Sequence, residues 1–154
     1  MYEKYLNCVH KNDIIKKDWG EGLVFFEIRN VENEIKYVEQ ELNFNLPLEL
    51  KKLYNELGYG FISKYNDYYF NRFISPIEIY DFYKGNNEYE NDERREYYPF
   101  DENNIIFYEV SETVFLTLKL DGDGVYYFDE KIAKSIPDFI EKMLRHHNYY
   151  IHQQ

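Results

Sequence analysis

Cysteine is almost absent from this chain, since Cys8 is the only one among 154 residues. A lone cysteine forms no disulfide within the chain, so nothing in the sequence is typical of an oxidising compartment. Long apolar runs are missing too. Those at 24–26 and 114–118 are far shorter than a membrane-spanning helix requires. Charged residues interrupt positions 1–17, unlike a signal peptide. We therefore expect a cytoplasmic protein that does not associate with membranes.

Positive charge is also scarce. The chain has 18 Lys and Arg against 29 Asp and Glu, which gives a formal net charge of −11 at pH 7. A protein with this charge repels phosphate backbones and anionic lipids and attracts basic surfaces. We therefore expect no direct binding of nucleic acid, and the charge favours a basic protein partner. Acidity that serves solubility alone stays open as an explanation.

Catalytic signatures are absent from the sequence. It lacks a glycine-rich phosphate loop, a nucleophile elbow, the protein-kinase motifs and a dinucleotide-binding fingerprint. Cys8 has no catalytic motif around it, so we interpret it as a small, partly buried apolar residue. We predict a protein that is not an enzyme and that needs no cofactor.

Two features resemble metal sites, and neither is complete. The segment 121–124 begins like a calcium loop, but Val125, Tyr126 and Ile132 stand where that loop needs an oxygen ligand, a glycine and a glutamate. A tight turn explains the same segment. His146 and His147 are adjacent, so they project from a helix at different angles and a solvated C-terminus explains them better. We predict no metal site.

Hydrophobic spacing predicts two helices joined by a short loop. Asn30 is placed to cap the first helix, Pro47 suits the first turn of the second, and Gly58 suits its left-handed stop. Before them, residues 2–17 are weakly patterned as a further helix, and 23–28 are predicted to be extended. The apolar residues of the two helices are Val31, Ile35, Val38 and Leu42, then Leu50, Leu53, Tyr54 and Leu57.

The rest of the chain alternates strands and short helices. Strands are predicted at 60–65, 68–73, 105–110, 113–120 and 124–129, and the apolar alternation from 114 to 120 is typical of a half-buried strand. A capping box, Ser75-Pro76-Ile77-Glu78, opens a helix that ends near Gly85, and Ser135 with Asp138 opens a final helix. Because hairpins join the strands, we predict an α+β fold in one domain, 1–154.

Residues 85–104 have the composition of a loop. They contain seven acidic residues and two arginines, with aromatic residues between them. Tyrosine presents a large apolar ring with a polar tip, and such residues often anchor protein interfaces. The residues predicted to bind a partner are Tyr89, Glu90, Asp92, Glu93, Tyr97 and Tyr98.

Several segments occur in an order that resembles the SUKH superfamily. Its N-terminal half resembles residues 28–42, the sequence Leu-Pro-Leu-Glu-Leu-Lys at 46–51 and Leu-Gly-Tyr-Gly-Phe-Ile at 57–62. The middle of the family resembles 71–79, and its closing strand and helix resemble 124–140. The resemblance extends over 28–144 and does not cover 1–27. It implies a largely antiparallel, mixed sheet flanked by helices.

The same resemblance implies a role. Bacterial members of the superfamily are typically cytoplasmic immunity proteins of polymorphic toxin systems, and each binds the toxin domain encoded beside it, often a nuclease. A nuclease carries a basic surface, towards which a protein of charge −11 is steered. We therefore expect an immunity protein that binds and neutralises one cognate, basic toxin. The family lends no contact residues to particular positions of this chain.

Two other functions stay open. A yeast branch of the superfamily regulates cell-wall synthesis through protein contacts, so the resemblance also allows an intracellular scaffold or regulator. The aromatic share of 20% allows a binder of small molecules or carbohydrates. That function predicts a concave, partly apolar pocket lined by tyrosines.

Overall fold

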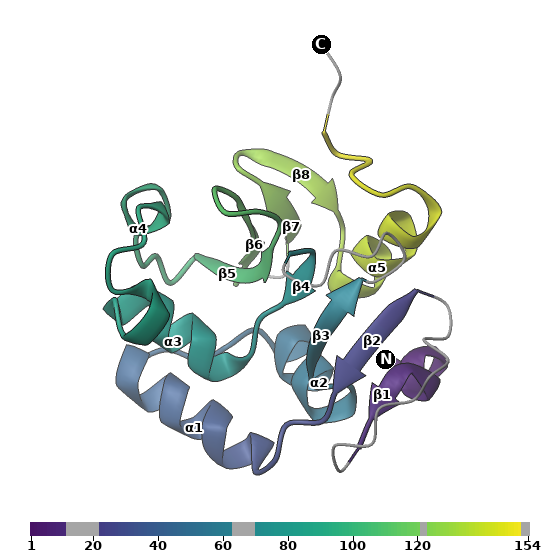
Figure 1. Cartoon of the computed structure of the whole chain (residues 1–154), viewed down its shortest axis with the longest axis horizontal. Helices are drawn as coiled ribbons and strands as arrows, with labels where there is room; N and C mark the ends of the chain where they lie inside the picture. Colours follow the sequence, from purple (N-terminus) through teal and green to yellow (C-terminus); the bar gives the residue numbers. More distant parts are fainter. Residues whose placement is uncertain (12–21, 63–69, 121–122, 152–154) are drawn as a thin grey trace.

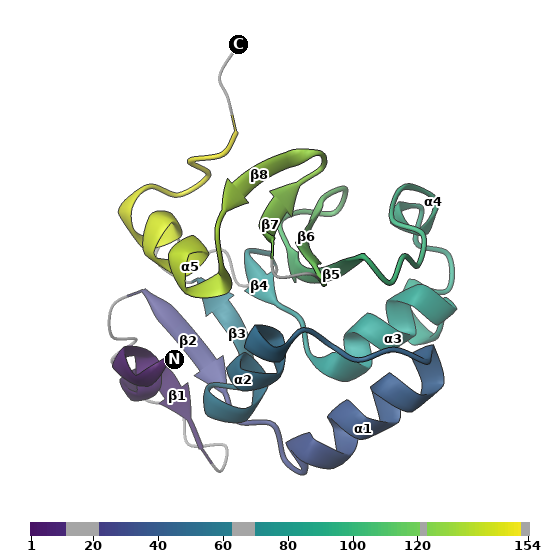
Figure 2. The same cartoon turned by 180° about the vertical axis from the view of Figure 1, so that it is seen from behind.

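The strands that the structure describes lie in one curved sheet, with helices packed beside it (Figures 1 and 2). The computed structural model describes residues 1–11, 22–62, 70–120 and 123–151. Its elements are, in chain order, η1 (Glu3–Cys8), β1 (Val9–His10), β2 (Leu23–Phe26), α1 (Val31–Leu42), α2 (Leu48–Glu56), β3 (Tyr59–Ile62), β4 (Arg72–Phe73), α3 (Pro76–Lys84), η2 (Asn87–Tyr89), α4 (Arg94–Tyr97), β5 (Asn104–Glu109), β6 (Phe115–Lys119), β7 (Gly124–Tyr127), β8 (Glu130–Ala133) and α5 (Ile136–Arg145).

The sheet follows the order of the chain, from β1 to β8 across the described residues. Strands β1 and β2 are parallel, whereas each later neighbouring pair is antiparallel. Helices α1 and α2 connect β2 to β3, and α3, η2 and α4 connect β4 to β5, while short turns join the later strands, as in α+β proteins. The predicted α+β class and the largely antiparallel, mixed sheet are therefore confirmed. The turn expected near residue 66 lies outside the described residues.

The N-terminal segment differs from its prediction. Instead of a helix over 2–17, the described part is a 3-10 helix followed by strand β1, and residues 12–17 lie outside the described range. Tyr2 is fully buried, and its hydroxyl donates a 2.9 Å hydrogen bond to the carbonyl of Glu49. Tyr5 is buried as well and donates to the carboxylate of Glu141. These two hydrogen bonds tie the N-terminal segment to α2 and α5.

Helices α1 and α3 lie side by side (Figure 1). The backbone N–H of Ile77 donates to the Glu34 carboxylate at 3.3 Å, and the rings of Tyr37 and Tyr80 meet edge to face. Asn30 occupies the predicted N-cap position, but it has φ 54° and its side chain makes no capping bond. Its left-handed backbone turns the chain into the helix instead.

Helix α3 forms as its local sequence predicts. The Ser75 hydroxyl accepts a hydrogen bond from the N–H of Glu78, and the Glu78 carboxylate accepts one from the N–H of Ser75. This reciprocal arrangement is a capping box, with Pro76 at the first helical position. Gly85 ends the helix with φ 70°. The predicted start and end of this helix are therefore confirmed.

Helix α2 begins at Leu48, with Pro47 as its N-cap, one position before the predicted first turn; it ends at Glu56, and Leu57 and Gly58 follow. Gly58 has φ 100°, and a Cβ there would lie 1.9 Å from the carbonyl oxygen of Phe26. No other residue type fits both the conformation and the space. The predicted glycine stop is confirmed, and it also allows the chain to pass close to β2.

Aromatic rings fill the middle of the core. Phe73 on β4 meets the rings of Tyr108 and Phe139, with centroids 4.9 and 6.2 Å apart, and all three side chains are fully buried. Aromatic pairs at these separations stabilise a core beyond the area that they bury. The core therefore joins β4, β5 and α5, three elements far apart in the sequence.

Strand β6 is buried on both faces, so its prediction as a half-buried strand is wrong. Leu116 and Leu118 face one side, and Phe115 and Thr117, on the opposite side, are buried too. Residues that follow α3 cover the second face, as described below. Among the residues that the structure describes, no helix combines the length and the apolar character needed to cross a membrane.

Candidate functional site

Residues 86–100, which we call the arm, fold over the face of β6 that carries Phe115. The arm contains η2 and α4 and is not an open loop, contrary to its composition. The ring of Tyr98 meets the Phe115 ring edge to face, and its hydroxyl accepts a 3.2 Å hydrogen bond from the Phe115 N–H. Phe82 of α3 contacts the same ring at 4.8 Å. Phe115 is thus enclosed by α3 and the arm.

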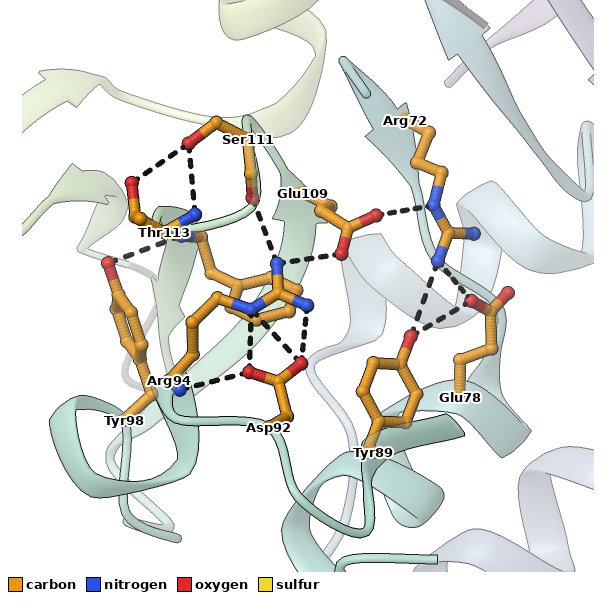
Figure 3. A network of polar contacts seen from close by, with 10 residues as sticks. Arg72, Glu78, Tyr89, Asp92, Arg94, Tyr98, Glu109, Ser111 and Thr113 are labelled. Atoms are coloured by element: carbon orange, nitrogen blue, oxygen red, sulfur yellow. Dashed lines mark hydrogen bonds and ion pairs between the residues drawn. The ribbon is translucent and has the colours of Figure 1, made fainter. Parts of the chain in front are cut away.

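Arg94 is the centre of the bonds that hold the arm (Figure 3). Its guanidinium group donates to both oxygens of Asp92, to a Glu109 oxygen at 2.7 Å and to the carbonyl of Ser111 at 2.9 Å. It also lies 4.3 Å from the centre of the Phe115 ring. Arg94 is 8% exposed, so these bonds form largely out of water, where charged hydrogen bonds are strongest.

Glu109 on β5 connects Arg94 to a second arginine. Its other carboxylate oxygen accepts a 2.7 Å hydrogen bond from Arg72 of β4 (Figure 3). Arg72 also donates to Glu78, the capping residue of α3, and to the hydroxyl of Tyr89 in the arm at 3.3 Å. One network of hydrogen bonds therefore joins the sheet, α3, the end of η2 at Tyr89 and the start of α4 at Arg94.

A cleft of about 470 Å³ opens beside this network. Phe61 and Tyr89 contribute rings to its lining. Its charged side chains are the four carboxylates of Glu78, Glu88, Asp92 and Glu109 and the two guanidinium groups of Arg72 and Arg94. All of these except the exposed Glu88 are bonded to one another. Carboxylates outnumber guanidinium groups, so the cleft disfavours anionic ligands. The charged groups that are bonded to one another hold the arm in place and are not free to bind a substrate.

The pKa shifts in the network follow from the same contacts. Burial lowers the pKa of Arg72, but hydrogen bonds and charge from Glu78 and Glu109 outweigh burial and leave the pKa raised. Burial raises the pKa of Asp92, but the hydrogen bonds from Arg94 outweigh it and leave that pKa below its usual value. Both groups therefore stay ionised at neutral pH, as a network of ion pairs requires.

Half of the predicted partner-binding residues face solvent. Glu90, Glu93 and Tyr97 are exposed, and Tyr97 keeps 74% of its surface accessible. An aromatic side chain this exposed contributes little to the hydrophobic core, so its position suits an interaction surface. Binding by these three residues stays a prediction.

The other three hold the arm in place. Tyr89 is 2% exposed and Tyr98 is 8% exposed, so neither ring can form the direct contact that its composition suggested. Asp92 is bonded through both oxygens to Arg94. The sequence pattern did not reveal this difference, because alternation between aromatic and acidic residues is the same for both groups. It also missed Arg72, Arg94 and Glu109, which lie far apart along the chain.

The residues weighed as metal ligands have structural partners. Within the described ranges, no three His, Cys, Asp or Glu side chains are arranged to hold a metal ion. Asp123 accepts from the hydroxyl of Tyr126, while residues 121 and 122 lie outside those ranges. The His147 Nε2 atom lies 2.8 Å from the Asn71 amide nitrogen. His146 is exposed, as a solvated C-terminus predicts, whereas Tyr150 is 2% exposed and packs on the fold; residue 152 lies outside the described ranges.

Comparison with known proteins decides the relationship that the sequence suggested. Residues 31–142 match the model of the SMI1/KNR4 family (SUKH-1). The chain belongs to that family. Among curated proteins, the immunity protein YxxD of Bacillus subtilis (strain 168) is 36% identical over 124 residues, which cover 78% of this chain and 84% of that protein. No solved structure matches this SUKH-1 protein. The arm, residues 86–100, lies inside the matched part of the chain.

Proposed function

We propose that this SUKH-1 protein is a non-enzymatic immunity protein that binds and neutralises one cognate toxin of a polymorphic toxin system. The observation that carries the proposal is its similarity to a protein named as an immunity protein, which extends over most of both chains. The family match supports the same role. We also propose that it acts in the cytoplasm, where its toxin would otherwise be active.

The charge supports a basic toxin of the nuclease type. Nucleases bind phosphate backbones and therefore carry positive surfaces. A partner of charge −11 is attracted to such a surface from a distance, which speeds association. Fast association is what an immunity protein needs, because it must engage its toxin before the toxin acts.

The arrangement of reactive groups supports a role in binding rather than catalysis. The charged groups of the cleft, apart from the exposed Glu88, are bonded to one another, and Cys8 is buried in the core. A catalytic site would instead bring titratable groups together at a position where a substrate can reach them. This cleft is lined mainly by charged side chains, whereas a carbohydrate binder predicts a concave, partly apolar pocket lined by tyrosines.

A growth-rescue assay tests the proposal. The toxin domain encoded beside the gene for this chain is induced in a bacterial host, with this protein, with an unrelated SUKH-1 protein, or alone. Growth restored by this protein and not by the unrelated one is the expected result. A toxin that kills equally in all three cultures would contradict cognate immunity and favour the scaffold function.

A further inference from the structure

The arm turns its two arginines towards the fold and exposes its four glutamates. Arg94 is buried against Phe115, and the Arg95 guanidinium group packs over Gly85 and donates a 3.0 Å hydrogen bond to the carbonyl of Phe82. Both arginines of the arm therefore turn towards the fold. Its four glutamates, Glu88, Glu90, Glu93 and Glu96, are exposed. The outer side of the arm is acidic because its own cations are engaged inside.

The turn between β7 and β8 exposes an aromatic ring at an unusual position. Tyr127 pairs with Glu130, so Phe128 and Asp129 form a two-residue turn. Phe128 has φ 53°, a left-handed backbone conformation that such turns normally give to glycine or asparagine. Its ring is 51% exposed. The chain thus places a large apolar ring where a smaller residue fits the backbone better.

The turn and the arm lie next to each other. The rings of Phe128 and Tyr98 stack with centroids 6.1 Å apart, so Phe128 is adjacent to the end of α4. Figures 1 and 2, seen from opposite sides, both show the β7–β8 turn on the same flank of the molecule as α4. Two exposed rings, those of Tyr97 and Phe128, therefore lie close to the acidic outer side of the arm.

We infer that this flank is the surface that binds the toxin; the inference rests on the proposed function. The acidic aromatic face, as we call it, consists of Glu93, Glu96, Tyr97, Phe128, Asp129 and Glu130, all of them exposed. Its occupant is a basic protein surface that carries arginine or lysine. The carboxylates attract those cations, and the two rings offer flat, apolar areas on which guanidinium groups and alkyl chains pack.

The buried charge network holds the acidic aromatic face in one conformation. Arg94 and Tyr98 fix α4 from within, and Tyr98 also contacts the ring of Phe128. A face built on a fixed support loses less conformational entropy on binding than a free loop would. In this proposal the toxin contacts the exposed rings of Tyr97 and Phe128. The buried rings of Tyr89 and Tyr98 no longer count as toxin contacts.

Binding kinetics with the purified toxin domain from the growth assay test this assignment. The double variant Glu93→Lys with Glu96→Lys is expected to associate at least about tenfold more slowly at low ionic strength. The matched control is Glu27→Lys with Glu41→Lys, two exposed residues beyond β2 and on α1. It changes the net charge equally, so an effect below about threefold is expected.

The variant Phe128→Gly tests the aromatic part. Glycine suits the backbone of the turn, so the variant should fold, and its dissociation from the toxin is expected to be about tenfold faster. Melting temperature and circular dichroism establish that each variant is folded.

The possible outcomes separate the two claims. Wild-type protein that binds the toxin, with face variants that bind equally well, would overturn the face and leave the immunity function intact. Wild-type protein that does not bind the toxin would overturn both. A dimer that Phe128→Gly abolishes, with toxin binding unchanged, would assign the face to a second copy of this chain and would also overturn the inference.

Discussion

The guanidinium group of Arg94 lies over the ring of Phe115, 4.3 Å from its centroid. A cation is stable in this position because the ring attracts it and because Glu109 and Asp92 neutralise it from the side. The contact joins the arm to β6 and explains why both faces of that strand are buried. The arm is therefore a part of the fold, although its composition is that of a solvated loop.

Replacing Arg94 with methionine tests this anchor. The variant Arg94→Met keeps apolar packing on Phe115 but leaves Asp92 with only the backbone N–H of residue 94 and Glu109 with Arg72 alone. The free energy of unfolding should fall by about 2–3 kcal/mol, the range for charged hydrogen bonds at a largely buried site. Arg94→Lys should not restore stability, because an ammonium group cannot reach the same acceptors together.

Urea denaturation measures this change, and Lys52→Met provides the control. Lys52 is exposed on α2, so the control should change the free energy of unfolding by less than about 0.5 kcal/mol. Equal stabilities for Arg94→Met and the wild type would mean that the network does not anchor the arm.

The capping box of α3 gives a second prediction. Ser75→Ala removes the acceptor for the N–H of Glu78 and should lower the free energy of unfolding by about 1 kcal/mol. Ser75→Gly should cost less, a few tenths of a kcal/mol, since glycine also suits the position before a helix. The comparison is made by chemical denaturation at pH 7. An alanine variant as stable as the wild type would show that the hydroxyl contributes nothing.

The lowered pKa of Asp92 predicts a dependence of stability on acid pH. Hydrogen bonds from Arg94 outweigh burial and lower this pKa below its unfolded value of about 3.9. The ionised carboxylate therefore stabilises the fold above that pH, and the contribution is lost as the pH falls through the lower, folded pKa. Asp92→Asn should be less stable than the wild type at pH 7, and the difference should shrink towards pH 2. A difference that does not depend on pH would contradict this origin.

Glu34 predicts a change of the opposite sign. Burial raises the pKa of its carboxylate; the Ile77 N–H opposes this shift, and the negative charge of Glu78 adds to it. Because the folded pKa is higher than the unfolded one, stability falls as rising pH ionises the group. Glu34→Gln keeps an oxygen acceptor for Ile77 without the charge, so its melting temperature should be above that of the wild type at pH 7. At pH 3 the two proteins should melt alike, and a variant that is less stable at pH 7 would contradict the sign.

Local signals in the sequence were sufficient for several elements. The capping box at Ser75, the glycine stops at Gly58 and Gly85 and the spacing of α1 all depend on residues within one or two turns of each other. Such signals act before tertiary contacts form, so a sequence pattern contains them completely. The family resemblance was carried by the same elements.

The arm was not predictable in this way. Whether Arg94 is buried depends on Glu109, fifteen positions later and on another element. Its neighbour Arg95 bonds to a carbonyl of α3 instead, and a charge pattern cannot tell the two arginines apart. The exposed position of Phe128 was not predicted for a related reason. Its turn contains no glycine that would have indicated a left-handed backbone conformation.

The most direct test of the immunity function is a titration of the purified toxin domain with this protein while the activity of the toxin is measured. If the protein neutralises its toxin by binding, activity should fall in proportion to added protein and reach zero at equimolar ratio. Glu27→Lys with Glu41→Lys should give the same curve, and Glu93→Lys with Glu96→Lys should need an excess. Full toxin activity in the presence of a large excess of wild-type protein would contradict an immunity function.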